Sequence, residues 1–375
     1  MKLSFAFFLL LLLGCTSKQN VADQRDSTVV APIPQSIILD EYFTKQFPAD
    51  EPGGSIIIMQ HDTVVLSKGY GVADIQSKEK VTTQTLFNVG SITKTFVSNA
   101  MLMLQEQKKL SIDDNLLKYF PDFENKDIAK KVTIHHLLTH SSGLPDIRNA
   151  YSPQDSAFFL TAKDLENWAP IMKASKLNFE SGSRYEYSNP AFNALALIIE
   201  QTSGMKWQQF VREKIMIPSG MNNSTITDGA HPQTGVAHAY ILSKGQWLEK
   251  DYMEEPTFAA SGNGGVWSSV EELRMYQQAL KNAVFLPKSV IEDSYTIKKF
   301  ANWKDSNPEK NGWSWFIGKT KEGYKTIGHT GSQGGFRANY VYVPEKDWFV
   351  VMLSGVPRPL EEYTERVFNF LQSGQ

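Results

Sequence analysis

A serine and a lysine, Ser91 and Lys94, lie three positions apart where a long apolar segment begins. Because positions three apart share one face of a helix, both side chains are predicted to point into the same site. Ser91 would lie in the first turn, where free backbone N–H groups and the helix dipole favour a developing oxyanion. A serine hydroxyl needs a nearby base, and a desolvated lysine can act as one. The pair predicts nucleophilic catalysis, although Ser-x-x-Lys alone occurs by chance in many helices.

A second group of polar residues, Tyr187-Ser188-Asn189, directly precedes a predicted helix. If Tyr187 lies beside Lys94, its phenol can lose a proton easily and relay one from the serine. Asn189 can orient Lys94 and bind a substrate carbonyl. Taken alone, such a tripeptide more often forms a turn with an asparagine cap, so both interpretations stay open.

A third group, His329-Thr330-Gly331-Ser332, lies in a glycine-rich stretch between two predicted strands. Small residues there would let a substrate backbone approach an exposed strand edge. The N–H groups of Ser332 and Ser91 would together form an oxyanion hole. The alternative is an ordinary glycine-rich hairpin loop.

The hydrophobic periodicity predicts the elements that position these groups. We expect an α/β fold in which one antiparallel sheet is flanked by helices and interrupted by a mainly helical lobe at about residues 110–260. The expected strands are residues 55–59, 63–66, 313–317, 324–328, 336–343 and 348–353, and the expected helices outside the lobe include residues 36–47, 271–281 and 360–371. Together these elements predict one domain at residues 36–375.

The composition excludes several classes of function. The chain has 375 residues, with 38 lysines and arginines against 40 aspartates and glutamates and no basic cluster, so nucleic acid is not expected as a partner. Cys15 is the only cysteine, so the domain that follows has no disulfides, catalytic thiolates or zinc–thiolate sites. Lys2 precedes an apolar run at residues 5–13, which is too short to span a bilayer as an ordinary helix and is typical of an export signal.

The end of this apolar run carries a second signal. Residues 12–15, Leu-Leu-Gly-Cys, resemble the cleavage site of bacterial lipoproteins. That resemblance implies a signal peptide at residues 1–14 and acyl chains on Cys15, which would hold the protein at a membrane surface. Residues 15–35 would form a tether, and the protein would be an exported, membrane-anchored lipoprotein on the periplasmic or cell-surface side. The alternative is an ordinary secretory signal with an incidental cysteine.

The three groups occur in the order, and at about the spacing, found in a known family. With residues 137–145 and 261–265, they resemble the serine β-lactamase-related hydrolases of the class C β-lactamase and DD-carboxypeptidase type, which also include esterases. The resemblance implies a β-lactamase/transpeptidase-like fold, with Ser91 as nucleophile and Lys94 and Tyr187 sharing the acid and base work. It also implies no metal or organic cofactor, and substrate binding by Asn189, His329, Thr330, Gly331 and Ser332.

His329 departs from the β-lactamase pattern, in which a lysine begins the third group. A neutral imidazole attracts a substrate carboxylate far less than an ammonium does, so efficient β-lactamase activity is not expected. We expect a lipid-anchored serine hydrolase that works through an acyl-enzyme on Ser91, as a DD-carboxypeptidase-type peptidase or an esterase. Its substrate would be a small molecule or a peptidoglycan-type peptide. The alternative is a penicillin- or peptidoglycan-binding sensor without turnover, which would usually have lost Ser91, Lys94 or Tyr187.

Two further features have competing interpretations. Arg337, on the strand after the third group, would either bind a substrate carboxylate or form a surface ion pair. His135, His136 and His140 lack the spacing of a His-Glu-x-x-His zinc site, so they are expected to be core or cap residues.

Overall fold

The computed structural model describes residues 34–146, 163–226, 234–249 and 261–373. The predicted signal peptide, Cys15 and all but the last two residues of the predicted tether lie outside the described residues. Residues 34–375 form one unit. Among the helices that the structure describes, none is both long enough and apolar enough to cross a membrane.

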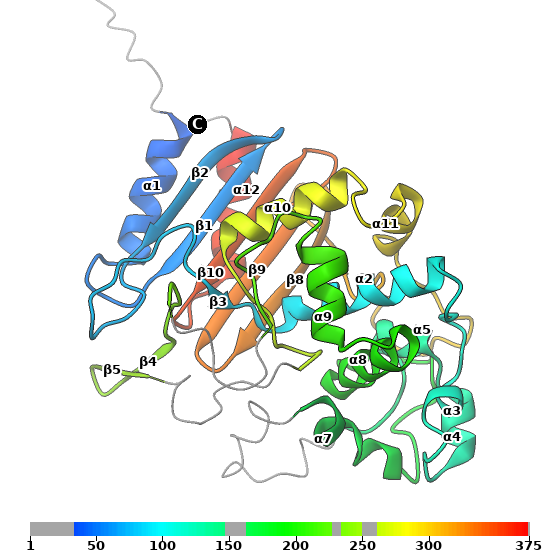
Figure 1. Ribbon diagram of the computed structural model, residues 1–375. Helices are drawn as coiled ribbons and strands as arrows, with labels where there is room; N and C mark the ends of the chain where they lie inside the picture. The colour runs from blue at the N-terminus through cyan, green and yellow to red at the C-terminus, as the bar shows by residue number, and fades with distance from the viewer. Residues whose placement is uncertain (1–33, 147–162, 227–233, 250–260, 374–375) are drawn as a thin grey trace, which may run out of the picture. The chain divides into compact units, whose positions relative to one another are not determined.

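A six-stranded antiparallel sheet lies at the centre of this unit (Figure 1). Its strands are β1 (Gly54–Gln60), β2 (Thr63–Tyr70), β7 (Phe316–Lys319), β8 (Lys325–Gln333), β9 (Phe336–Val343) and β10 (Trp348–Ser354). The spatial order is β2-β1-β10-β9-β8-β7, so β1 from the start of the domain pairs with β10 from its end. Gly54 lies opposite Ser354 in that pair, and Gln60 lies opposite Trp348. The predicted fold class is therefore confirmed.

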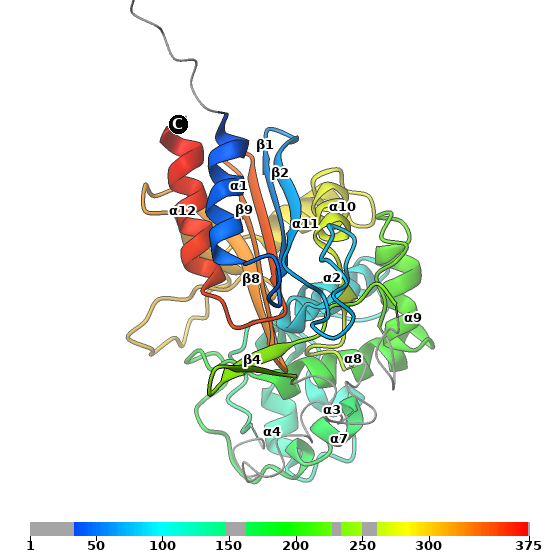
Figure 2. The same cartoon turned by 90° about the vertical axis from the view of Figure 1, so that its left-hand side faces the viewer.

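Helices cover both faces of the sheet. The covering helices are α1 (Gln35–Gln46), α2 (Thr93–Glu106), α10 (Val270–Lys281) and α12 (Leu360–Ser373). α1 and α12 lie on one face, and α2 and α10 on the other (Figures 1 and 2). Ile56 and Ile58 of β1 pack in the cluster that includes α1 and α12, whereas Ile57 belongs to the larger core with α2 and α10. Burial of both faces explains why β1 is a continuous apolar run rather than an alternating one.

The described chain between β2 and β7 holds all the helices except α1 and α12, joined by turns and loops. Its elements are the 3₁₀ turn η1 (Gly90–Ile92), α3 (Leu116–Tyr119), α4 (Lys126–Lys131), α5 (Ile134–Leu138), α7 (Asp164–Trp168), the 3₁₀ turn η4 (Ile171–Lys173), α8 (Asn189–Ser203), α9 (Trp207–Val211), the π-turn η5 (Arg212–Met216) and α11 (Lys288–Ser294). Two short pairs of strands interrupt it: β3 (Phe87–Asn88) with β6 (Trp267–Ser268), and the hairpin of β4 (Tyr240–Ser243) and β5 (Gln246–Glu249). The sequence analysis did not predict that hairpin.

Two strands of the main sheet differ from the prediction. β7 begins at Phe316 rather than at residue 313, because Ser314 has a left-handed backbone (φ 68°) and the two flanking tryptophans are buried in the core. β8 continues to Gln333, five residues beyond its predicted end, and so includes the whole third group. That group therefore lies on a strand rather than in a hairpin loop.

Candidate active site

Ser91 and Lys94 meet where the chain passes from η1 into α2. The Lys94 Nζ donates a hydrogen bond to the Ser91 Oγ, 3.0 Å away, in agreement with the three-residue spacing. Lys94 is fully buried, because α2 runs through the core. A buried ammonium needs acceptors around it, and two carbonyl oxygens provide them. The Asn189 Oδ1 lies 2.8 Å from the Nζ, and the Asn263 main-chain oxygen lies 2.6 Å from it.

A buried carboxyl group holds the loop that supplies the Asn263 oxygen. Asp164, the first residue of α7, accepts a hydrogen bond from the Gly262 N–H at 2.8 Å and another from the Asn193 Nδ2 at 2.7 Å. Burial raises the pKa of Asp164 to about 7. Sequence reasoning missed this residue, since an aspartate at the start of a short helix is an ordinary N-terminal residue.

Tyr187 lies beside the lysine, the placement that the proton relay considered from the sequence requires. Its ring centroid is 5.0 Å from the Lys94 Nζ. The next residue, Ser188, is the N-cap of α8 and accepts the Ala191 N–H with its hydroxyl, so the cap is a serine rather than an asparagine. The start of α8 therefore brings both Tyr187 and Asn189 to Lys94.

His140 also belongs to the site, although its spacing predicts only a core or cap residue. Its buried ring stacks on Tyr187 with centroids 4.3 Å apart, and its Nδ1 accepts the Ser188 N–H at 3.0 Å. Burial and the nearby Lys94 charge lower the pKa of His140 well below its ordinary value, so the ring is neutral. The only signal in the sequence was its place among residues 137–145, which contribute to the family resemblance.

The backbones of β8 and η1 lie in direct contact. A Cβ atom on Gly331 would lie 2.0 Å from the Val89 carbonyl oxygen, and one on Gly90 would lie 2.6 Å from the Ser332 nitrogen. Gly90 also has a left-handed backbone (φ 52°), which favours glycine. This contact brings the Ser332 backbone beside the turn that carries Ser91. The sequence analysis did not single out Gly90.

One edge of β8 faces this turn. β7 pairs with β8 only from Lys325 to Gly328, whereas β9 pairs with the other edge as far as Gln333. Among the described strands, none pairs with residues 329–333 on the side of η1. An extended substrate can bind along such an edge through main-chain hydrogen bonds.

His329 is buried and neutral. Its Nδ1–H donates to the Thr330 carbonyl oxygen at 2.6 Å, and its ring stacks on Phe316 with centroids 4.3 Å apart. Burial, together with the Lys94 charge, lowers the pKa of His329 to about 3. In this environment the imidazole carries no charge even in mild acid.

Arg337 lies opposite Ser332 on β9. Its Nη1 donates to the Ser332 Oγ at 2.7 Å and to the Phe336 carbonyl oxygen at 2.9 Å. No carboxylate of the described residues forms an ion pair with Arg337, so the surface ion pair considered from the sequence is not found there. The guanidinium instead contacts the third group directly.

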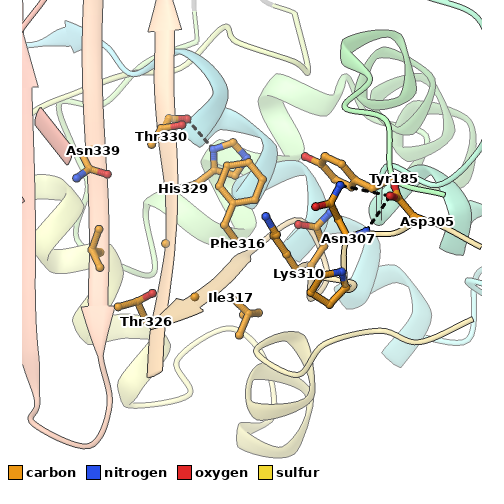
Figure 3. A pocket seen from close by; sticks show the side chains of 15 residues that line it. Tyr185, Asp305, Asn307, Lys310, Phe316, Ile317, Thr326, His329, Thr330 and Asn339 are labelled. Carbon is orange, nitrogen blue, oxygen red and sulfur yellow. Dashed lines mark hydrogen bonds between the residues drawn. The ribbon is translucent and has the colours of Figure 1, made fainter. Parts of the chain in front are cut away.

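A cavity of about 570 Å³ opens beside His329 (Figure 3). Its lining comes from Tyr185, from the loop at residues 305–311, and from β7, β8 and β9. His329 and Thr330 are shared between the cavity and the third group, whereas Ser91, Lys94 and Tyr187 do not line it. The cavity therefore lies next to the serine–lysine pair but does not include it.

Comparisons with known sequences agree with this geometry. Residues 42–369 match the protein family described as Beta-lactamase. A penicillin-binding protein of Bacillus subtilis is 25% identical over 294 residues, which cover 76% of this chain and 63% of that protein. Protein flp of Staphylococcus aureus is 24% identical over 330 residues, which cover 85% of this chain and 63% of that protein. The chain therefore spans less than two thirds of the length of these curated relatives.

Solved structures show the same fold. The octameric penicillin-binding protein homologue from Pyrococcus abyssi superimposes with a TM-score of 0.77 and 28% identity, over 90% of this chain and 76% of that chain. The D-amino acid amidase from Ochrobactrum anthropi superimposes with a TM-score of 0.73 and 20% identity, over 91% of this chain and 98% of that chain, a likeness of fold alone. Because the family match extends over most of the chain, this protein belongs to the Beta-lactamase family, as the three sequence groups predicted.

Proposed function

We propose that this protein is a serine hydrolase that forms an acyl-enzyme on Ser91. The observation that carries the proposal is that the Lys94 ammonium donates hydrogen bonds to the Ser91 Oγ, to the Asn189 Oδ1 and to the Asn263 carbonyl oxygen. The two carbonyl oxygens can only accept, so they orient the nitrogen. If Lys94 loses one proton, its lone pair is directed at the Ser91 hydroxyl, as a general base requires.

The proposed acylation moves one proton and exchanges one bond. The Ser91 Oγ bonds to the substrate carbonyl carbon while its proton passes to Lys94 or Tyr187. The N–H groups of Ser91 and Ser332 stabilise the oxyanion, which the contact between η1 and β8 supports. Collapse of this intermediate breaks the bond to the leaving group, which takes up the proton. Water then releases the acyl group from Ser91 in the reverse sense.

The neutral imidazole of His329 is the basis for the class of substrate that we propose. A carboxylate beside the oxyanion hole would find no charge on this imidazole, because burial lowers the pKa of His329 to about 3. We therefore propose a DD-carboxypeptidase-type peptidase or an esterase rather than an efficient β-lactamase. Two relatives are named for binding penicillin. Among these substrates we propose D-amino-acid peptides of the peptidoglycan type.

Covalent labelling tests the mechanism. The protein is incubated with a fluorophosphonate and a fluorescent penicillin, and the modified residue is located by mass spectrometry. Both labels are expected on Ser91, and Ser91→Ala should lose both while its circular dichroism stays unchanged. Ser98→Ala is the matched control, because Ser98 lies on the same helix with its hydroxyl bonded to the Trp313 carbonyl. Full labelling of Ser91→Ala would contradict the mechanism.

The same experiment separates turnover from mere binding. A wild-type protein that keeps its penicillin label indefinitely and hydrolyses no ester or D-amino-acid peptide would be a sensor without turnover. Release of the label, or multiple turnovers of an ester, would establish the hydrolase.

We also propose that the protein is exported and anchored through acyl chains on Cys15. The support is the Leu-Leu-Gly-Cys sequence at residues 12–15 after an apolar run. Cys15→Ser should change a detergent-extracted membrane protein into a soluble or unprocessed one. A wild-type protein that fractionates entirely with soluble proteins in its native cell would contradict the anchor.

A further inference from the structure

The cavity beside His329 borders Tyr187, one of the two groups proposed to carry the proton from Ser91 to the leaving group. Phe316 and His329, which both line the cavity, have ring centroids 6.3 Å and 6.4 Å from that of Tyr187. In acyl transfer, the bond to the leaving group breaks where a general acid can reach it. The cavity therefore lies on the leaving-group side of Ser91, an assignment that rests on the proposed function.

One lysine of the cavity lining has an available ammonium group. In Figure 3 the Lys310 side chain extends from its loop toward Phe316 and His329. Within the described residues, no hydrogen bond, ion pair or ring contact occupies the Lys310 ammonium. Two other lysines of this part of the chain are paired, Lys298 with Asp293 and Lys304 with Glu180. An unpaired cation beside a cavity attracts anions.

Neither His329 nor Asp305, which also line the cavity, can take this role. His329 is neutral because it is buried beside Lys94. The Asp305 Oδ1 accepts hydrogen bonds from the Asn307 N–H at 3.0 Å and from its Nδ2 at 3.4 Å, and these contacts with the loop keep the pKa of Asp305 below its ordinary value. Asp305 thus stays ionised and bonded to its own loop. Lys310 is the one cationic side chain among the described residues that line the cavity.

We propose that this cavity holds the leaving group of the substrate, and that Lys310 binds a carboxylate on that leaving group. Phe316 provides an aromatic surface for an apolar part of the same group, since its ring lies in the wall between Lys310 and the third sequence group. The substrate class is then an amide or ester whose leaving group is bulky and anionic. A cation outside the third group would supply the charge that His329 lacks.

Two esters that differ only in the charge of the leaving group test the proposal. 3-Acetoxybenzoate carries a carboxylate at neutral pH, and 3-acetoxybenzamide replaces it with a neutral amide of nearly the same shape. The ratio of their kcat/KM values is measured for the wild type and for Lys310→Met. We expect the ratio to fall about five- to tenfold in the variant, as for one partly exposed charge-assisted hydrogen bond. Lys310→Arg should restore most of it.

Two variants control for long-range charge and for the other nearby cation. Lys319→Met removes an exposed lysine of β7 that does not line the cavity, so its ratio should equal that of the wild type. Arg337→Met removes the guanidinium that contacts Ser332. A ratio that falls in Arg337→Met but not in Lys310→Met would overturn the assignment of the anion to Lys310. The assignment would also be overturned if the ratio of kcat/KM for the two esters were the same in the wild type and in every variant.

A binding measurement keeps the proposal testable without turnover. The released leaving group, 3-hydroxybenzoate, is titrated into Ser91→Ala with and without Lys310→Met and followed by ligand-observed NMR. Weaker binding in the double variant is expected, and equal binding contradicts the proposal. Failure of the proposed function has a different signature, because Ser91 would then remain unlabelled by fluorophosphonate whatever residue stands at position 310.

Discussion

The buried carboxyl group of Asp164 makes the stability of this protein depend on pH in a predictable way. Its pKa is about 7 in the folded chain, compared with an ordinary value of 3.8. Between these two values the folded protein holds a proton that the unfolded chain has released. The folded state therefore loses stability as pH rises through this range, and the loss is complete above the folded pKa.

The size of the effect follows from the two pKa values. Raising the pKa from 3.8 to about 7 corresponds to a loss of about 4 kcal/mol of stability over the whole range, of which about 2–3 kcal/mol falls between pH 5 and pH 8. Asp164→Asn removes the ionisation but keeps an oxygen for the Gly262 N–H and the Asn193 Nδ2. Relative to this variant, the wild type should thus lose about 2–3 kcal/mol of stability from pH 5 to pH 8.

Guanidinium unfolding of both proteins at the two pH values measures this difference. Asp122→Asn is the matched control, because Asp122 is exposed, and its pH dependence should equal that of the wild type. If Asp164→Asn and the wild type changed equally with pH, the carboxyl group would be ionised in the folded protein and the reasoning from burial would be refuted. Asp164→Ala adds a separate readout: without an acceptor for Gly262, the loop that holds Lys94 is released, so fluorophosphonate labelling of Ser91 should slow, whereas Asp164→Asn should label nearly as the wild type does.

Three more outcomes follow from the site. Gly90→Ala should slow fluorophosphonate labelling about 100-fold, because the methyl would lie 2.6 Å from a backbone nitrogen of β8, whereas Gly204→Ala, also left-handed but with open space around it, should label normally. The pH profile of kcat/KM for a neutral ester, from about pH 5.5 to pH 8, should have the same shape in His329→Gln as in the wild type, because the pKa of His329 is about 3. If the variant lost a pH-dependent step that the wild type shows in this range, His329 would titrate there and the argument from burial would be wrong. His140→Phe should keep the stacked ring but leave the buried Ser188 N–H without its acceptor, which would cost about 1–3 kcal/mol in guanidinium unfolding; an equally stable variant would contradict the hydrogen bond.

Local patterns were enough to predict the six strands of the main sheet, although not all their limits, and the helices that cover it. The spacing of Ser91 and Lys94 predicted their contact because both lie within one helical turn, where chain geometry determines the neighbours. The period-two pattern predicted β9 at its observed limits, residues 336–343. It failed at β7, where two tryptophans that look like strand residues are buried around a left-handed Ser314.

Local sequence patterns could not predict contacts between distant parts of the chain. Asp164 matters because it meets Gly262, 98 positions away, and His140 because it meets Ser188, 48 positions away. Lys310 is one of many lysines in the sequence, and only the folded loop directs it to a cavity. The pKa of His329 depends on burial that no motif encodes.

Lys94 shows why the three sequence groups can be recognised in the sequence, whereas the residues that hold them in place cannot. Its ammonium is bonded to Asn189, 95 positions away, and to the Asn263 carbonyl, 169 positions away. The first partner is a side-chain oxygen, so the type of residue that supplies it can be recognised in the sequence. The second is a main-chain oxygen that any residue could supply, and its position depends on Asp164 through a further hydrogen bond. Side chains that touch the reacting atoms are constrained in type and spacing, whereas the groups that hold them are constrained only in space, so they become visible only once the chain is folded.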